Sequence, residues 1–190
     1  MSFALILANV AVFLVELLVG PSLVDRFALW PAASAAFRIW QLLSYSLLHA
    51  GIVHLAYNMM GLALFGRDLE RLLGSARFLV LYVCSVLAGG LAQLAVGQAT
   101  STAATPTVGA SAGVFGVLAA YAVRLPKRRV ILLFPPIAMP VWLFVTGYAL
   151  VELLSGVSGD AGVAHFAHLG GMLGAIACLM LWRPARASGA

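Results

Sequence analysis

A serine and a histidine stand inside two apolar runs of the chain, where polar groups are rare. Ser111 lies in the run GASAG (109–113), and His168 lies in the run AHFAHLGG (164–171). Ionisable and polar groups inside a membrane segment are costly and therefore usually functional. Serine with histidine is also the minimal pair for acyl transfer. The two runs therefore predict a hydrolase whose reacting groups are buried in a membrane.

The composition is that of an integral membrane protein. Of the 190 residues, 63% are hydrophobic and 9% are charged, and the mean hydropathy is +1.05. A chain with so few charged residues cannot provide the polar surface that a soluble protein needs. Once several spans of about 20 residues each are subtracted, no length remains for a sizeable soluble domain. We expect an all-α, polytopic membrane protein that folds as one compact bundle.

Apolar runs between charged residues and Gly or Pro breaks predict six transmembrane helices. They cover residues 3–19, 49–66, 76–97, 110–124, 130–154 and 163–182. The prolines at 135, 136 and 140 are expected to kink or unwind the inner part of the fifth helix. The loop 21–48 mixes charges with Trp30 and Trp40, which is typical of a segment that lies on the membrane surface. Residues 1–190 are thus predicted to form a single domain.

The basic residues predict the orientation of the bundle. All but Arg26 and Arg38 of the 11 Lys and Arg residues fall on the same side as the N-terminus. Because cytoplasmic loops are enriched in these residues, both termini are predicted to face the cytoplasm. The same pattern explains the net charge of +5, so no nucleic-acid partner is expected. A cleaved signal peptide is not expected either, since no basic residue precedes the first apolar run.

The predicted topology places four polar side chains in the outer half of the bundle. Ser111 and His168 lie at similar depth, and His54 and Asn58 share one face of the second helix because they are four residues apart. Each has an ordinary explanation when taken alone. A serine in a span usually bonds its own backbone, and a lone histidine more often lines an ion path or has a structural role. The combination favours a catalytic site.

Small residues allow the helices of Ser111 and His168 to approach closely, as contact between the two side chains requires. They occur as small-xxx-small pairs on the fourth and sixth predicted helices: Gly109 with Gly113, Ala112 with Gly116, and Gly170 with Gly174. The same pairs would also serve general helix packing.

Other polar residues have weaker claims to function. His49 is expected to have a structural hydrogen-bonding role, and His165 is left out of the catalytic set as a residue of the water entrance or the interface. Cys84 and Cys178 lack CxxC spacing and are interpreted as small core residues. No metal site and no cofactor is predicted.

Several motifs together resemble the signatures of rhomboid intramembrane serine proteases. They are GASAGVFG (109–116), His49 followed by HLAYN (54–58), and AHLGG (167–171). The segments WQLLSY (40–45) and ERLLG (70–74) also look rhomboid-like. The motifs occur in the family's order, and the resemblance covers essentially the whole chain.

By this resemblance, Ser111 is the nucleophile and His168 the general base of a dyad that lacks the carboxylate of a triad. Glu152 and Asp160 are the nearest acids to the sixth helix, but neither has motif support. Both are therefore expected to mark the outer loop, with Glu152 hydrated. The implied activity is an endopeptidase that cleaves in or near transmembrane segments through an acyl-enzyme.

The resemblance also implies donors for the oxyanion that forms during acyl transfer. They are His54, Asn58 and the backbone N–H of Ser111, which lies at the positive end of a helix dipole. Supporting positions are Phe115, packed on the histidine, and the glycines Gly109, Gly113 and Gly171.

The sequence departs from the family pattern at two positions. Ala112 stands where glycine is usual after the serine, which concerns the local backbone. Gln41 stands where many members have arginine after tryptophan, which leaves open how the outer loop is anchored.

Three other functions stay open at this point. They are a rhomboid-like pseudoprotease that binds without cutting, a small transporter or channel lined by His54, Asn58 and His168, and a structural assembly factor. The expected partners are transmembrane protein substrates and the lipid bilayer. The expected location is a bacterial plasma membrane, because the chain is rich in Ala, Leu, Gly and Arg and shows no organelle-targeting presequence.

Overall fold

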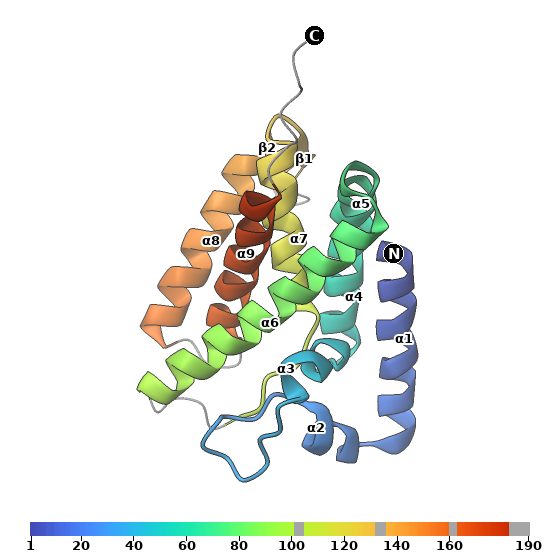
Figure 1. Ribbon diagram of the computed structural model, residues 1–190, viewed down its shortest axis with the longest axis vertical. Coiled ribbons are helices and arrows are strands. Elements are labelled where there is room, and N and C mark those ends of the chain that lie inside the picture. Colours follow the sequence, from blue (N-terminus) through green and yellow to red (C-terminus); the bar gives the residue numbers. More distant parts are fainter. Residues whose placement is uncertain (101–104, 132–135, 160–162, 183–190) are drawn as a thin grey trace.

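The computed structural model describes residues 1–100, 105–131, 136–159 and 163–182. Over these residues the fold is mostly helical, with one two-stranded hairpin (Figure 1). The elements are α1 (Ser2–Val19), α2 (Ser22–Phe27), α3 (Gln41–Ser44), η1 (Tyr45–Leu47), α4 (Ile52–Gly61), η2 (Leu62–Gly66), α5 (Arg67–Leu73), α6 (Ser75–Thr100), α7 (Ser111–Arg124), β1 (Arg129–Ile131), β2 (Ala138–Pro140), α8 (Val141–Ser158) and α9 (His165–Leu181). Asp160 and Pro135, which carried predictions, lie outside the described residues.

Apolar helices with outward-facing apolar side chains identify the fold as a membrane bundle. Helices α1 and α6 are long and apolar enough to cross a bilayer, and the bent pair Gln41–Leu47 and Ile52–Leu73 is a third candidate. Helices α7, α8 and α9 are apolar but shorter. Leu18 and Leu181 are 87% and 82% exposed, which suits contact with lipid better than contact with water.

Helices α6, α7 and α9 meet at small residues. A methyl group added at Gly171 of α9 would lie 2.1 Å from the carbonyl oxygen of Ala112 in α7. One added at Gly116 of α7 would lie 2.1 Å from the hydroxyl of Ser85 in α6. Both distances are far below van der Waals contact, so glycine at these positions lets the three backbones approach closely.

The predicted small-residue pairs join three helices rather than two. Gly170 and Gly174 of α9 face Ala92 and Ala88 of α6, whereas Gly171, one position along, faces α7. The prediction that the pair at 170 and 174 contacts the helix of the serine is therefore wrong. Neighbouring positions on a helix point in different directions, and α9 uses adjacent glycines for two different partners.

The fifth predicted helix, 130–154, starts later than expected. Strands Arg129–Ile131 and Ala138–Pro140 pair antiparallel, and α8 begins only at Val141. Pro140 occupies the N-cap position with extended backbone, which suits a residue that has no N–H to donate. The described chain is thus not helical at Pro136 and Pro140, as expected of these prolines, and the prediction of helix from residue 130 is wrong.

The second predicted helix, 49–66, is also displaced along the chain. Helix α4 begins at Ile52, and helical structure continues through η2 and α5 to Leu73. Segment η2 is π-helical, a form that occurs mostly as short bulges inside α-helices.

Gln41 anchors the outer segment between α1 and α4. Its side chain is fully buried, with 0% exposure. The side-chain oxygen accepts from the backbone N–H groups of Trp30 and Arg38, at 3.3 and 3.1 Å. The amide nitrogen donates to the carbonyl groups of Arg26 and Ala36, at 3.3 and 3.0 Å. Four loop positions are therefore tied to one side chain, as a buried polar group requires.

The outer segment also holds the residues that lead into α7. Leu29 and Thr107 pair as a β-bridge, with N–H···O distances of 2.9 Å in both directions. The N–H of Gly109 donates to the carbonyl oxygen of Tyr45 at 2.9 Å. These bonds fix the backbone immediately before Ser111.

Figure 1 shows how the elements are distributed between the two ends of the bundle. The start of α1, helix α5 and the hairpin β1–β2 lie at one end, and α2 and α3 lie at the other. Helices α7 and α9 begin on the side of α2 and α3, which brings their first turns together.

Candidate active site

Ser111 is the first residue of α7, and the backbone before it determines how the serine faces the cavity. Gly109 has a φ of +128°, a conformation that other residues rarely adopt. A methyl group at Gly109 would lie 2.6 Å from the ring of His54. The first N–H groups of a helix have no partner within it. Ser111 therefore presents both its hydroxyl and its backbone N–H at the positive end of α7.

His168 lies in the first turn of α9 and contacts the serine. Its Nε2 is 2.9 Å from the Oγ of Ser111, although the two residues are 57 positions apart. The ring of Phe115 stacks on the imidazole, with centroids 4.2 Å apart and planes 4° from parallel. The structure thus brings a hydroxyl and an imidazole to the distance that proton transfer requires.

His54 and Asn58 of α4 border the same cavity as Ser111 and His168. This cavity has a volume of about 1290 Å³. Asn58 Nδ2 donates to the His54 carbonyl oxygen at 3.0 Å. A side-chain amide has two N–H groups, so a second donor remains on Asn58. The four polar residues predicted to lie together share one site.

Gly113 and Gly171 lie behind the site rather than in its cavity. A methyl group at Gly113 would lie 2.4 Å from the ring of Tyr82. Ala112, which replaces the usual glycine, is fully buried, and its methyl group is 2.6 Å from where a methyl at Gly89 would be. Glycine at 89 therefore provides the space that Ala112 needs.

Glu152 of α8 contacts the base, and the sequence analysis missed it. Its carboxylate is buried, with the residue 4% exposed, and Oε2 is 2.9 Å from the Nδ1 of His168. The same oxygen is 2.7 Å from the Nδ1 of His165. The expectation of a hydrated Glu152 in the outer loop is wrong, as is the expectation that no acid adjoins His168. No local motif links the two residues, but an acid in an apolar helix was itself a signal.

The other two histidines are placed differently from each other. His165 is buried against Glu152, so it does not merely occupy the interface. The ring of His49 packs edge-on against that of His54, with centroids 5.1 Å apart. Both ring nitrogens of His49 are buried without a hydrogen-bond partner among the described residues, while its backbone N–H donates to Glu16 at 3.1 Å. Among the described residues, the hydrogen bond of His49 is thus made by its backbone, while its ring packs against His54.

Metal ligands do not gather in the part of the chain that the structure describes. Within those ranges, no group of three or more His, Cys, Asp and Glu side chains could hold a metal ion. Cys84 is half-buried, Cys178 is buried, and both are free thiols.

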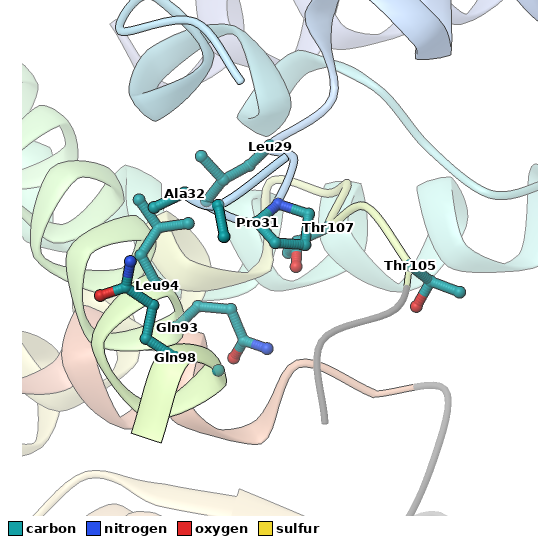
Figure 2. A pocket seen from close by; sticks show the side chains of 10 residues that line it. Leu29, Pro31, Ala32, Gln93, Leu94, Gln98, Thr105 and Thr107 are labelled. Carbon is teal, nitrogen blue, oxygen red and sulfur yellow. The ribbon is translucent and has the colours of Figure 1, made fainter. Parts of the chain in front are cut away.

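A second, smaller cavity lies beside the outer segment (Figure 2). Its volume is about 210 Å³, and its lining includes Leu29, Pro31 and Gln98. Neither Ser111 nor His168 borders it, so it is separate from the reacting pair.

Comparison with known proteins decides the family. Residues 36–184 match the family model described as the Rhomboid domain. The chain belongs to the rhomboid family. Among rhomboid relatives, it is 27% identical over 169 residues to Rhomboid protease GlpG of Yersinia pestis (strain Pestoides F), covering 86% of this chain and 56% of that protein.

Two further rhomboid relatives are more similar over shorter stretches. Rhomboid protease GluP of Bacillus subtilis (strain 168) is 37% identical over 94 residues, which are 49% of this chain and 17% of that protein. Rhomboid protein 1, mitochondrial, of Saccharomyces cerevisiae is 34% identical over 134 residues, covering 66% of this chain and 36% of that protein. This rhomboid chain thus spans less than two thirds of the length of each relative.

Proposed function

We propose that this rhomboid is an intramembrane serine endopeptidase that cleaves peptide bonds in or near the transmembrane segments of other membrane proteins. The observation that supports it most directly is the 2.9 Å contact between Ser111 Oγ and His168 Nε2 at the edge of a large cavity. Relatives named rhomboid proteases support the same activity.

The reaction begins when Ser111 Oγ attacks the carbonyl carbon of the scissile peptide. The Nε2 of His168 accepts the hydroxyl proton, and the imidazolium then gives that proton to the leaving amine as the C–N bond breaks. An ester remains on Ser111. Water, deprotonated by the same imidazole, hydrolyses the ester and restores the free hydroxyl.

Three donors stabilise the negative charge that develops on the carbonyl oxygen. They are the backbone N–H of Ser111 and the side chains of His54 and Asn58, which lie around the same cavity. Donors fixed before the reaction need no reorganisation as the charge forms, which is why they lower the barrier.

The cavity suits an apolar segment of polypeptide. Phe144 and Tyr148 of α8 and Phe115 of α7 contribute aromatic rings to its lining. A helical substrate hides its peptide groups in hydrogen bonds, so the cleaved segment must unwind locally before Ser111 can reach it. Substrates with small or helix-breaking residues near the outer membrane face are therefore favoured.

The proposal includes six membrane spans, with both termini in the cytoplasm of a bacterium and the site in the outer half of its plasma membrane. The basic residues of α5 and of the segment between α7 and β1 lie at the end opposite α2 and α3, which supports this orientation. The bacterial relatives GlpG and GluP support the location.

The test is cleavage of a fluorogenic transmembrane-segment substrate by the purified protein in liposomes. Ser111→Ala should lose cleavage while keeping the wild-type melting temperature. His168→Ala should also lose cleavage while still giving a cooperative melting transition. Ser158→Ala, at an exposed serine of α8, serves as the matched control and should cleave at the wild-type rate.

Two outcomes would contradict the proposal. Cleavage by Ser111→Ala at the wild-type rate would reject the nucleophile. No cleavage by the wild type across a panel of permissive substrates would reject the peptidase, and binding and ion-flux assays would then separate a pseudoprotease from a transporter.

A further inference from the structure

The buried acid of α8 has no part in the reaction described above. Glu152 is the one acidic residue between Val141 and Ser158, and it lies in an otherwise apolar helix. A carboxylate inside a membrane bundle is costly unless it is paired. Here it contacts the Nδ1 of His168, whereas Ser111 contacts the other ring nitrogen, Nε2.

We infer that Glu152 is a positioning residue that sets the tautomer and orientation of His168, so that this rhomboid works with a Ser-His-Glu triad rather than a dyad. The inference rests on the peptidase proposed above. An ionised carboxylate only accepts hydrogen bonds, so the proton of neutral His168 resides on Nδ1. Nε2 then carries the lone pair, and it is Nε2 that lies 2.9 Å from Ser111 Oγ.

The stack with Phe115 cannot fix the ring by itself. Parallel rings 4.2 Å apart restrict the plane of the imidazole. A 180° rotation about the Cβ–Cγ bond of His168 would keep that plane but exchange each ring nitrogen with a carbon. Such a turn would take Nε2 away from Ser111. The 2.9 Å contact between Glu152 Oε2 and Nδ1 opposes it, because turning the ring would leave a buried carboxylate without this donor.

His165 allows the carboxylate to remain ionised when His168 is neutral. Its Nδ1 lies 2.7 Å from the same Oε2, so two imidazole N–H groups replace the water that the buried carboxylate has lost. When His168 takes the serine proton, the negative charge of Glu152 is already in place beside the imidazolium. Stabilising that cation is the task of the acid in a serine-protease triad.

A purely structural role makes different predictions. Glu152 joins α8 to the first turn of α9, so it could act only as a clasp between the helices. Loss of a clasp would lower stability or raise KM, because the cavity wall would move. Loss of a positioning residue would lower kcat and slow the covalent reaction of Ser111 with a fluorophosphonate, while KM and the melting temperature stay near the wild-type values.

The test compares Glu152→Gln and Glu152→Asp with the wild type in liposomes. The amide of the Gln variant has the shape of the carboxylate without its charge, so we expect kcat to fall about 100-fold or more with KM changed less than about twofold. Fluorophosphonate labelling of Ser111 should slow in parallel. The Asp variant should recover at least part of the loss. Glu70→Gln is the matched control and should keep wild-type kcat, because the Glu70 carboxylate bonds to the N-terminus, Ser2 and Ser75 rather than to the site.

A second measurement uses the unmodified protein and so does not depend on the folding of a variant. Nitrogen-15 spectra of histidine-labelled wild type, with His168 assigned from His168→Ala, should show the Nδ1–H tautomer. An Nε2–H tautomer, or wild-type kcat in Glu152→Gln, would overturn the inference while leaving the peptidase intact. If the wild type neither cleaves nor labels, the peptidase itself fails and the inference falls with it.

Discussion

At the scale of single residues, the site depends on polar side chains that a hydrogen bond holds in place. Asn58 illustrates this, because one amide N–H is bonded to the carbonyl group of His54. That bond restricts the orientation of the amide plane, which also carries the second N–H. A donor fixed in this way stabilises an oxyanion without loss of side-chain entropy at the moment of reaction.

Asn58→Ala should therefore lower kcat about 100- to 1,000-fold, as loss of one oxyanion donor does elsewhere, with little change in KM. Steady-state cleavage of the transmembrane substrate in liposomes measures both constants. Gln93→Ala is the control, since this amide lines both this cavity and the smaller one beside the outer segment. Equal kcat in Asn58→Ala and the wild type would remove Asn58 from the oxyanion site.

The sequence supplied the reacting residues but not their full surroundings. Ser111, His168, His54 and Asn58 stand in motifs, so a local pattern was enough to propose that they share a site. Glu152 reaches His168 through the packing of α8 on α9, 16 residues away along the chain. Its partner depends on the crossing of two helices, which no local spacing encodes. Gln41 was noticed only as a departure, yet its four hydrogen bonds organise the outer loop.

At the scale of helices, the contact between Ser111 and His168 is set by the small residues that follow them. Gly171 is three residues after His168, and Ala112 directly follows Ser111. Because a methyl at Gly171 would meet the carbonyl oxygen of Ala112 at 2.1 Å, any side chain there must push α7 and α9 apart. The atoms displaced would be those that join the nucleophile to its base.

Gly171→Ala should lower the free energy of unfolding by about 1–3 kcal/mol, the usual cost of overpacking, and should also reduce cleavage. Gly147→Ala in α8 is the control, because a methyl there has no atom within 4 Å. Denaturant-induced unfolding in detergent and the cleavage assay test the two parts. A Gly171→Ala variant as stable and active as Gly147→Ala would show that the helices can separate without cost.

Apolar periodicity predicted the helices well but not the unwound stretch before α8. The run from 130 is rich in Val, Ile and Leu, which serve equally in a strand and in a membrane helix. The prolines disfavour the helix here, because Pro140 has no backbone N–H to donate and its ring would clash with a preceding helical turn. The kink was expected, but the antiparallel pairing of β1 with β2 depends on a contact that the sequence pattern does not show.

At the scale of the whole molecule, the bundle has one basic end and one end that carries the outer segment. Lys127 lies exposed between α7 and β1, whereas Ala35 lies exposed in the loop that Gln41 anchors. If the positive end is cytoplasmic, these two positions are on opposite sides of the membrane.

Single cysteines at Lys127 and Ala35, in a background with both native cysteines replaced by alanine, should react on opposite sides. In intact cells, a membrane-impermeant maleimide should label Ala35→Cys, and it should label Lys127→Cys only after the membrane is opened. Cleavage activity of each variant provides the control for folding. Labelling of Lys127→Cys in intact cells would reverse the orientation.

The position of His168 in α9 has a consequence for biosynthesis. Helix α9 is the last helix that the structure describes, and the nucleophile lies 57 residues earlier. A nascent chain that has inserted only as far as α8 carries Ser111 and Glu152 but lacks His168, the base that contacts both. The proposed peptidase therefore stays inert while the ribosome and the insertion machinery handle neighbouring membrane proteins, and it gains activity only when the segment that forms α9 enters the bilayer.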